Sequence, residues 1–263
     1  MPSSQINDIL HKAKLSSAPI NFNASGSFAN GFEDIVFLDF DYLNFGKTSL
    51  AGRLVKNEYY QASFAGRSFD LTPILNHMDE EDDDAETPNF QISVSATQLI
   101  IKNGQFLNNA NLQLLCLNDE CNNLSLKSDK SSVTLANDNL QIISSDAGSL
   151  LKGFDAYEYM SGGRLQLDAT LEGDNYKGGV VLKDFTITKG KFLPKILLLG
   201  SLKGISDVLQ GEGISFKKLT SRFAKSDSQI NIDAFRAYGP AIGMTADGYF
   251  DEEKDIIRLS GNI

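Results

Sequence analysis

The amino-acid sequence predicts a mainly β protein, built as a long antiparallel sheet with a few short helices. Glycine is abundant, at 22 residues, and proline is scarce, at 6. Polar breaks of Asn, Asp, Ser and Gly separate short apolar runs about every ten residues, which is typical of antiparallel strands. Several runs alternate apolar and polar residues, as at 90–95 and 230–233. Such alternation places the apolar side chains of a strand on one face of the sheet.

This pattern predicts about fifteen strands. Twisted open sheets rarely exceed about ten strands, so a longer sheet must curl, split into two packed sheets or close. The pattern alone allows both a sandwich that fills its own core and a groove open to a ligand. The expected strands are 20–29, 34–45, 48–56, 58–70, 89–103, 105–116, 121–128, 131–136, 139–145, 163–173, 176–188, 213–224, 228–237, 241–250 and 254–262.

Helical signals are few and short. The first lies at the start of the chain, where Ser4 can cap a turn, and the second follows Leu71 and Thr72, with Pro73 tolerated in its first turn. The third begins near Asp146, whose carboxylate can accept free amides of the first turn. The fourth covers about 192–209 and carries an apolar stripe. Helices this sparse do not suit a parallel α/β fold.

The chain of 263 residues can form one large domain or two modest ones. An acidic loop at 79–88 marks a possible division into 1–78 and 89–263. The alternative is one continuous β-rich chain, 1–263, in which this segment is a long hairpin loop. We favour the continuous sheet, because neither half changes in composition and proline at 88 suits the start of a strand.

The net charge of −10 comes largely from seven acids within 79–86. The rest of the chain is nearly balanced and has no basic stripe, so nucleic acid is not expected as a partner. Consecutive carboxylates without a glycine predict a solvated loop, although a weak divalent-cation site stays open. The longest apolar stretches, such as 196–199, are far shorter than the roughly 20 residues that span a bilayer. The N-terminus also lacks a signal region, which indicates a cytosolic protein or a fragment without its targeting segment.

Residue patterns typical of catalysis or metal binding are missing from the sequence. The histidines, His11 and His77, have no second histidine or cysteine at i+3 or i+4. Neither a Gly-x-Ser-x-Gly elbow nor a phosphate-binding glycine loop occurs, and the glycines at 211–213 are read as a turn. We therefore expect no enzyme, with no catalytic residue, no metal and no cofactor.

The cysteines, Cys116 and Cys121, flank four residues that are expected to form a hairpin loop. They can face each other across the two strands. An oxidising compartment would favour a disulfide, whereas the cytosol would keep them as thiols. Both states remain open.

A series of short motifs in the second half of the chain carries a family resemblance. Asp-x-Gly stands at 146–148, Gly-Gly-x-Leu-x-Leu at 162–167, Gly-x-Gly-Ile-x-Phe at 211–216 and Gly-x-Thr-x-Asp-Gly at 243–248. In this order over roughly 140–263, they resemble the C-terminal region of the AsmA-like superfamily, in particular YhdP-type proteins of Gram-negative bacteria and their alphaproteobacterial relatives. Residues 58–140 look like the part that precedes it, and the first 55 match only in style.

The resemblance implies a bridge-type lipid carrier of the periplasm, anchored to the inner membrane in the full-length protein. Its curled sheet would form a half-pipe with an apolar floor. Its partners would be phospholipid, the inner and outer membranes, and protein partners at those membranes. The chain lacks the membrane helix of such proteins and stops at 259–263, where relatives continue, so we expect a fragment of a longer protein.

The expected function is phospholipid binding in this groove, in support of lipid transport between the membranes and of outer-membrane homeostasis. The alternative is an interaction or scaffold module for outer-membrane assembly, with a self-filled β core. The helix at 192–209 would cap the groove or contact a membrane. One parity of each strand would line the floor, with Phe22, Phe64, Ile92, Val94, Leu112, Leu114, Leu165, Leu167, Ile230, Ile232, Ile242 and Met244 as the lipid-binding residues.

Overall fold

The computed structural model describes residues 19–30, 34–77, 89–118, 120–188, 213–226, 228–240, 242–251, 253–254 and 256–263. The chain divides into two compact units, Met1–Asp129 and Lys130–Ile263. The expected helices at the start of the chain and at 192–209 lie outside the described residues, as do His11 and the acidic run at 79–86.

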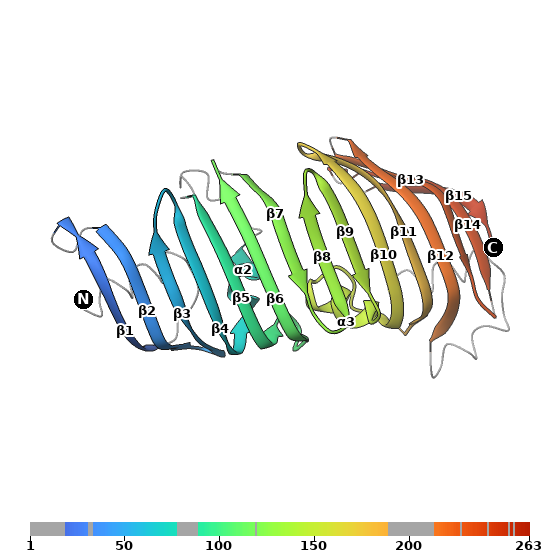
Figure 1. The fold of residues 1–263 in the computed structure, drawn as a ribbon. Helices are drawn as coiled ribbons and strands as arrows, with labels where there is room; N and C mark the ends of the chain where they lie inside the picture. Colours follow the sequence, from blue (N-terminus) through green and yellow to red (C-terminus); the bar gives the residue numbers. More distant parts are fainter. Residues whose placement is uncertain are drawn as a thin grey trace. The chain divides into compact units, whose positions relative to one another are not determined.

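The first unit is an antiparallel sheet with one parallel pair of strands, and its strands lie in the sheet in chain order (Figure 1). The elements are β1 (Ile20–Ala29), β2 (Asp34–Phe45), β3 (Thr48–Lys56), β4 (Tyr60–Asp70), α2 (Thr72–His77), β5 (Phe90–Ile100), β6 (Phe106–Leu117) and β7 (Glu120–Lys127).

The connection between β4 and β5 differs from the expected hairpin. These strands are parallel, with Tyr60 opposite Phe90 and Asp70 opposite Ile100. Parallel neighbours need a crossover connection of about a dozen residues or more, and 71–89 provides one that includes α2. The expectation of a long hairpin loop at 79–88 is therefore wrong. Alternation within a strand does not reveal the direction of its neighbour, and the sequence pattern could not distinguish the two connections.

The second unit is antiparallel in every strand pair that the structure describes for it (Figure 1). Its strands also follow chain order in the sheet. The elements are β8 (Ser131–Ala136), β9 (Asn139–Ser144), α3 (Ala147–Gly153), β10 (Met160–Glu172), β11 (Asn175–Ile187), β12 (Ile214–Ser226), β13 (Gln229–Tyr238), β14 (Gly243–Asp251) and β15 (Ile256–Asn262).

The expected helix after Asp146 is present as α3. The Asp146 carboxylate accepts a hydrogen bond from the backbone N–H of Ser149 at 3.4 Å and pairs with the Lys130 ammonium at 2.9 Å. A carboxylate at this position satisfies an amide that has no partner within the helix. Burial raises the pKa of Asp146, but the hydrogen bonds from Lys130 and Ser149 outweigh it and leave the pKa below its ordinary value.

Several strands of the second unit break the strict alternation of sides, among them β10 and β11. Gly163 and Asp184 have positive φ angles of 89° and 53°. After Asp184, the buried side of β11 moves from Leu182 to Phe185, and both Lys183 and Asp184 are exposed. Phe185 then stacks on Phe216 of β12, with ring centroids 5.2 Å apart. The irregularity brings these aromatic rings to the buried side of the sheet.

The prediction of a mainly β chain with a long, mostly antiparallel sheet and few short helices is confirmed. Four strands have the predicted bounds, β1, β2, β3 and β8. The largest differences are the start of β10, at Met160 and not at 163, and the end of β5. β5 stops at Ile100 because a turn follows, closed by a hydrogen bond from Ile101 N–H to the Gln105 carbonyl at 2.9 Å.

Candidate functional site

The apolar face of the first unit is built from residues in direct register across its strands. One row joins Phe64, Val94, Leu112 and Leu126, on β4 to β7. The adjacent row joins Ala62, Ile92, Leu114 and Leu124 on the same strands. Directly opposed residues share a face of the sheet. The predicted residues Phe64, Ile92, Val94, Leu112 and Leu114 therefore lie together on one face.

Phe22 belongs to the same face through aromatic contacts. Its ring centroid lies 6.4 Å from that of Phe40, and Phe40 lies 5.9 Å from Phe64. Gly52 stands between Phe40 and Phe64 in the register of β2, β3 and β4. A side chain on Gly52 would collide with the Ser63 carbonyl and the Phe64 ring. The missing side chain lets the two rings meet above the strand.

Burial is strong in the middle of this first face. Val94 is 3% exposed, Leu112 9%, Ala110 2% and Leu126 4%. Phe22, Phe64, Ile92 and Leu114 are half-buried. The centre of this face is thus already covered by the protein itself.

The apolar face of the second unit is also continuous in register. One row runs through Leu165, Leu182, Leu219, Ala237 and Met244, on β10 to β14. Leu167 pairs with Val180 on the same face. Ile242 precedes Met244 by two positions, and its carbonyl accepts a hydrogen bond from Gly239 N–H at 2.8 Å.

Two further rows extend this second face to its last strand. Phe223, Ile232, Gly248 and Leu259 form one row on β12 to β15. The other joins Lys225, Ile230, Phe250 and Ile257. The Lys225 ammonium also lies 5.9 Å from the centre of the Tyr176 ring.

The second face is less buried than the first. Leu165 and Ile242 are 4% and 7% exposed, but Leu167, Ile230, Ile232 and Met244 are half-buried. Exposure rises toward the edge strand, where Ile257 is 48% and Leu259 is 55% exposed. Sequence reasoning missed Phe223, Phe250, Ile257 and Leu259 as members of this face. Only their register with Ile230 and Ile232 identifies them.

The opposite face of the second unit is polar. Asp168 accepts hydrogen bonds from the amides of Gln141 at 2.8 Å and Gln166 at 3.0 Å, which hold the pKa of its carboxyl below the usual range. A shallow depression lies beside it, over Gly179, and is also lined by Thr220 and Arg222. The two faces of this sheet therefore differ sharply in chemistry.

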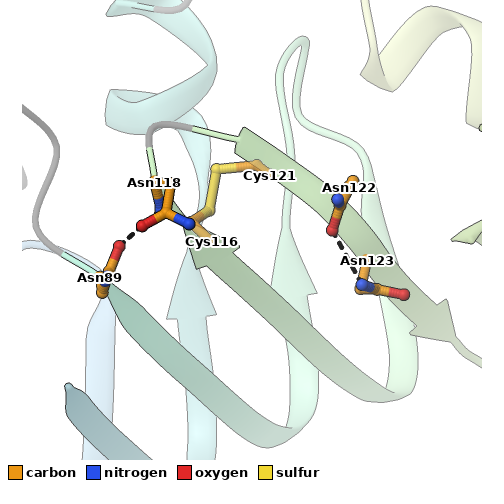
Figure 2. Close-up of a disulfide and its surroundings, with 6 residues drawn as sticks. All are labelled: Asn89, Cys116, Asn118, Cys121, Asn122 and Asn123. Atoms are coloured by element: carbon orange, nitrogen blue, oxygen red, sulfur yellow. Dashed lines mark hydrogen bonds between the residues drawn. A yellow bond between two sulfur atoms is a disulfide. The ribbon is translucent and has the colours of Figure 1, made fainter. Parts of the chain in front are cut away.

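The cysteines form a disulfide that closes the turn between β6 and β7, as Figure 2 shows. The connection is shorter than the expected four-residue loop, because β6 continues to Leu117 and β7 starts at Glu120. Asn118 in this turn has a φ of 53°, and its N–H donates to the Asn89 side-chain carbonyl at 2.6 Å. Cys116 is 1% exposed, whereas Cys121 is exposed.

The described residues hold no group of three or more His, Cys, Asp and Glu side chains arranged for a metal ion. His77 is the last residue of α2. No helix in the described part of the chain is long and apolar enough to cross a membrane.

Comparison with known proteins adds no further identification. No family model matches the chain, and no curated protein or solved structure matches it. The resemblance to AsmA-like proteins stays a prediction from the sequence motifs.

Proposed function

We propose that this chain binds the acyl chains of phospholipids along the apolar face of its sheet and supports lipid transport between the membranes of a Gram-negative cell. The observation that carries this proposal is the half-exposed apolar face of the second unit. Within the described part of that unit, no second sheet packs on the rows that end at Ile257 and Leu259. Acyl chains would cover this surface with a gain of about 25 cal/mol per Å² removed from water.

The composition of this face suits a flexible apolar ligand. Its rows combine aromatic and aliphatic side chains with Gly248, which leaves a low point between Ile232 and Leu259. A contiguous apolar surface of this kind on a protein in water usually marks an interaction site. Lipid binding requires no bond making, so we propose a carrier and not an enzyme.

The disulfide supports a place outside the cytosol. Bonds between cysteines persist in oxidising compartments, including the bacterial periplasm, and are rare in the cytosol. The Cys116–Cys121 bond therefore favours the periplasmic location that the AsmA-like resemblance implies. Inner-membrane anchoring and outer-membrane contacts of a longer protein belong to the same proposal.

A second function is favoured by one specific observation. The middle of the first face is filled, with Val94, Ala110 and Leu126 almost inaccessible. A self-filled face suits an interaction or scaffold module for outer-membrane assembly. In this second function, the half-exposed rows of the second unit would bind a partner protein and not lipid.

Native mass spectrometry with lipid extraction tests the proposal on the purified chain. Val180 and Val181 are adjacent, half-buried and on opposite faces, because Val180 pairs with Leu167 and Val181 with Gln166. We expect the wild type to carry phospholipid, Val180→Asp to lose most of it and Val181→Asp to keep it. Circular dichroism confirms that both variants fold.

Ile232→Asp and Leu167→Asp extend the test along the same face. Both residues are half-buried members of the apolar rows. A wild-type chain that stays free of lipid after incubation with phospholipid vesicles would contradict the proposal and support the scaffold function. Equal lipid loss in Val180→Asp and Val181→Asp would likewise contradict binding on the apolar face.

A further inference from the structure

The polar face of the second unit carries three cations in direct register on neighbouring strands. Arg164 of β10 lies opposite Lys183 of β11, and Lys183 lies opposite Lys218 of β12. We call Arg164, Lys183 and Lys218 the basic row. Tyr238 of β13 continues it next to Lys218 and is 54% exposed. Like charges directly opposed on a sheet are destabilising, so this arrangement has a cost that the fold alone does not explain.

The nearby carboxylate does not compensate the two lysines of the row. Asp184 accepts a hydrogen bond from Arg164 and pairs with Lys217 at 3.6 Å. The bond from Arg164 lowers the pKa of Asp184, and the charge of Lys217 lowers it further, so this group is fully ionised and held by two cations. Within the described ranges, neither Lys183 nor Lys218 forms an ion pair.

The irregular backbone at Asp184 produces this distribution of charge. Its positive φ turns Lys183 and Asp184 both toward solvent, although they are consecutive. Asp184 can therefore pair with Arg164 of the basic row and with Lys217 beside it. Lys183 stays opposite Lys218. The local surface has four cations, the basic row and Lys217, around one carboxylate.

We propose that the basic row docks the second unit on a membrane surface that carries anionic phospholipid headgroups. Lysine is a compact cation that suits phosphate oxygens, and basic residues beside an anionic bilayer each strengthen binding appreciably. Tyr238 adds an exposed aromatic ring of the kind that favours the headgroup level of a bilayer. The net charge of −10 opposes general attraction to such a surface, so binding must come from a local patch.

This docking surface is separate from the proposed lipid-binding face. Arg164, Lys183 and Lys218 alternate with Leu165, Leu182 and Leu219, which belong to the apolar row. The proposal therefore goes beyond acyl-chain binding and holds or fails independently of it. Vesicle binding measures the docking, whereas lipid extracted from the purified protein measures the cargo.

Vesicle flotation tests the docking with the full chain of 263 residues. The probes are vesicles of phosphatidylcholine alone and vesicles in which about a third of the lipid is phosphatidylglycerol, at low and at high salt. The test variant is Lys183→Gln with Lys218→Gln. The control is Lys177→Gln with Lys254→Gln, which removes the same charge from lysines already paired with Glu172 and Asp251.

We expect the wild type to bind the anionic vesicles more tightly than the neutral ones and to lose this preference at high salt. The test variant should bind the anionic vesicles at least about tenfold more weakly, while the control stays close to wild type. Absence of wild-type binding, equal binding to both kinds of vesicle, or equal losses in both variants would overturn the proposal. Circular dichroism of both variants shows that any loss does not come from unfolding.

Discussion

The rings of Phe40 and Phe64 meet across Gly52, with their centroids 5.9 Å apart. Phe40, Gly52 and Phe64 belong to three successive strands. The two rings can touch because Gly52, on the middle strand, has no side chain. This relationship fixes how the apolar face of the first unit is filled.

Gly52→Ala should therefore destabilise the protein. A Cβ atom at this position would lie 2.6 Å from the Phe64 ring and would also collide with the Ser63 carbonyl. Overpacking of this kind costs about 1–3 kcal/mol. Urea unfolding measures the loss. Gly179→Ala is the control, since its new methyl group would meet only the Ser221 carbonyl at 3.6 Å. Equal stability of Gly52→Ala and wild type would show that the rings do not need this glycine.

Asp146→Asn tests the cap of α3 and its dependence on pH. The folded-state pKa of Asp146 is lowered, so its ionised form adds stability above the ordinary pKa near 3.8, and that part is lost as pH falls. Near neutral pH the substitution removes the ion pair with Lys130 but keeps a capping oxygen, so we expect a loss below about 1 kcal/mol.

Chemical unfolding at several pH values measures this difference. The gap between wild type and Asp146→Asn should stay constant above about pH 5 and shrink below it. The comparison variant is Asp168→Asn. The Asp168 carboxylate accepts its hydrogen bonds from the neutral amides of Gln141 and Gln166, so this substitution removes a carboxylate that is not held by a lysine. A gap for Asp146→Asn that does not change with pH would contradict the assigned role of its charge.

Reduction of the Cys116–Cys121 bond should lower stability by about 2 kcal/mol, because the bond closes a short loop and restricts the unfolded chain. Unfolding with and without a reducing agent measures the change. Cys121→Ser provides the control: it should unfold like the reduced wild type and should not respond to the reducing agent. A wild type that ignores the reducing agent would show that its cysteines are thiols in solution.

The sequence predicts the strands well because alternation and turn residues are local signals. β1, β2, β3 and β8 begin and end as expected, and α3 begins after the expected cap at Asp146. Parallel pairing of β4 with β5 was not predictable from alternation, which is the same for both strand directions. The switch of sides at Asp184 was also missed, because positive φ is uncommon for residues other than glycine.

The candidate residues show a similar limit. Within one strand, residues two apart share a face, which places Ile92 with Val94 and Leu165 with Leu167. Burial depends on residues distant in sequence. Val94 and Leu165 are therefore buried, whereas Ile92 and Leu167 are half-buried. Ile257 and Leu259, at the exposed ends of the rows, could be identified only from the register of β14 with β15.

The most direct test of lipid binding uses the fact that the chain has no tryptophan. A single tryptophan at a chosen position reports on its own surroundings by fluorescence. Ile257 and Ile256 are adjacent, exposed and on opposite faces, because Ile257 pairs with Phe250 and Ile256 with Asp251. Ile257→Trp and Ile256→Trp are thus a matched pair for the two faces.

The measurement is quenching of each tryptophan by phospholipid with bromine atoms on its acyl chains. If acyl chains lie on the apolar face, the lipid quenches the tryptophan of Ile257→Trp strongly and that of Ile256→Trp little. Equal quenching of the two variants, or quenching of neither, would contradict the proposed lipid-binding face.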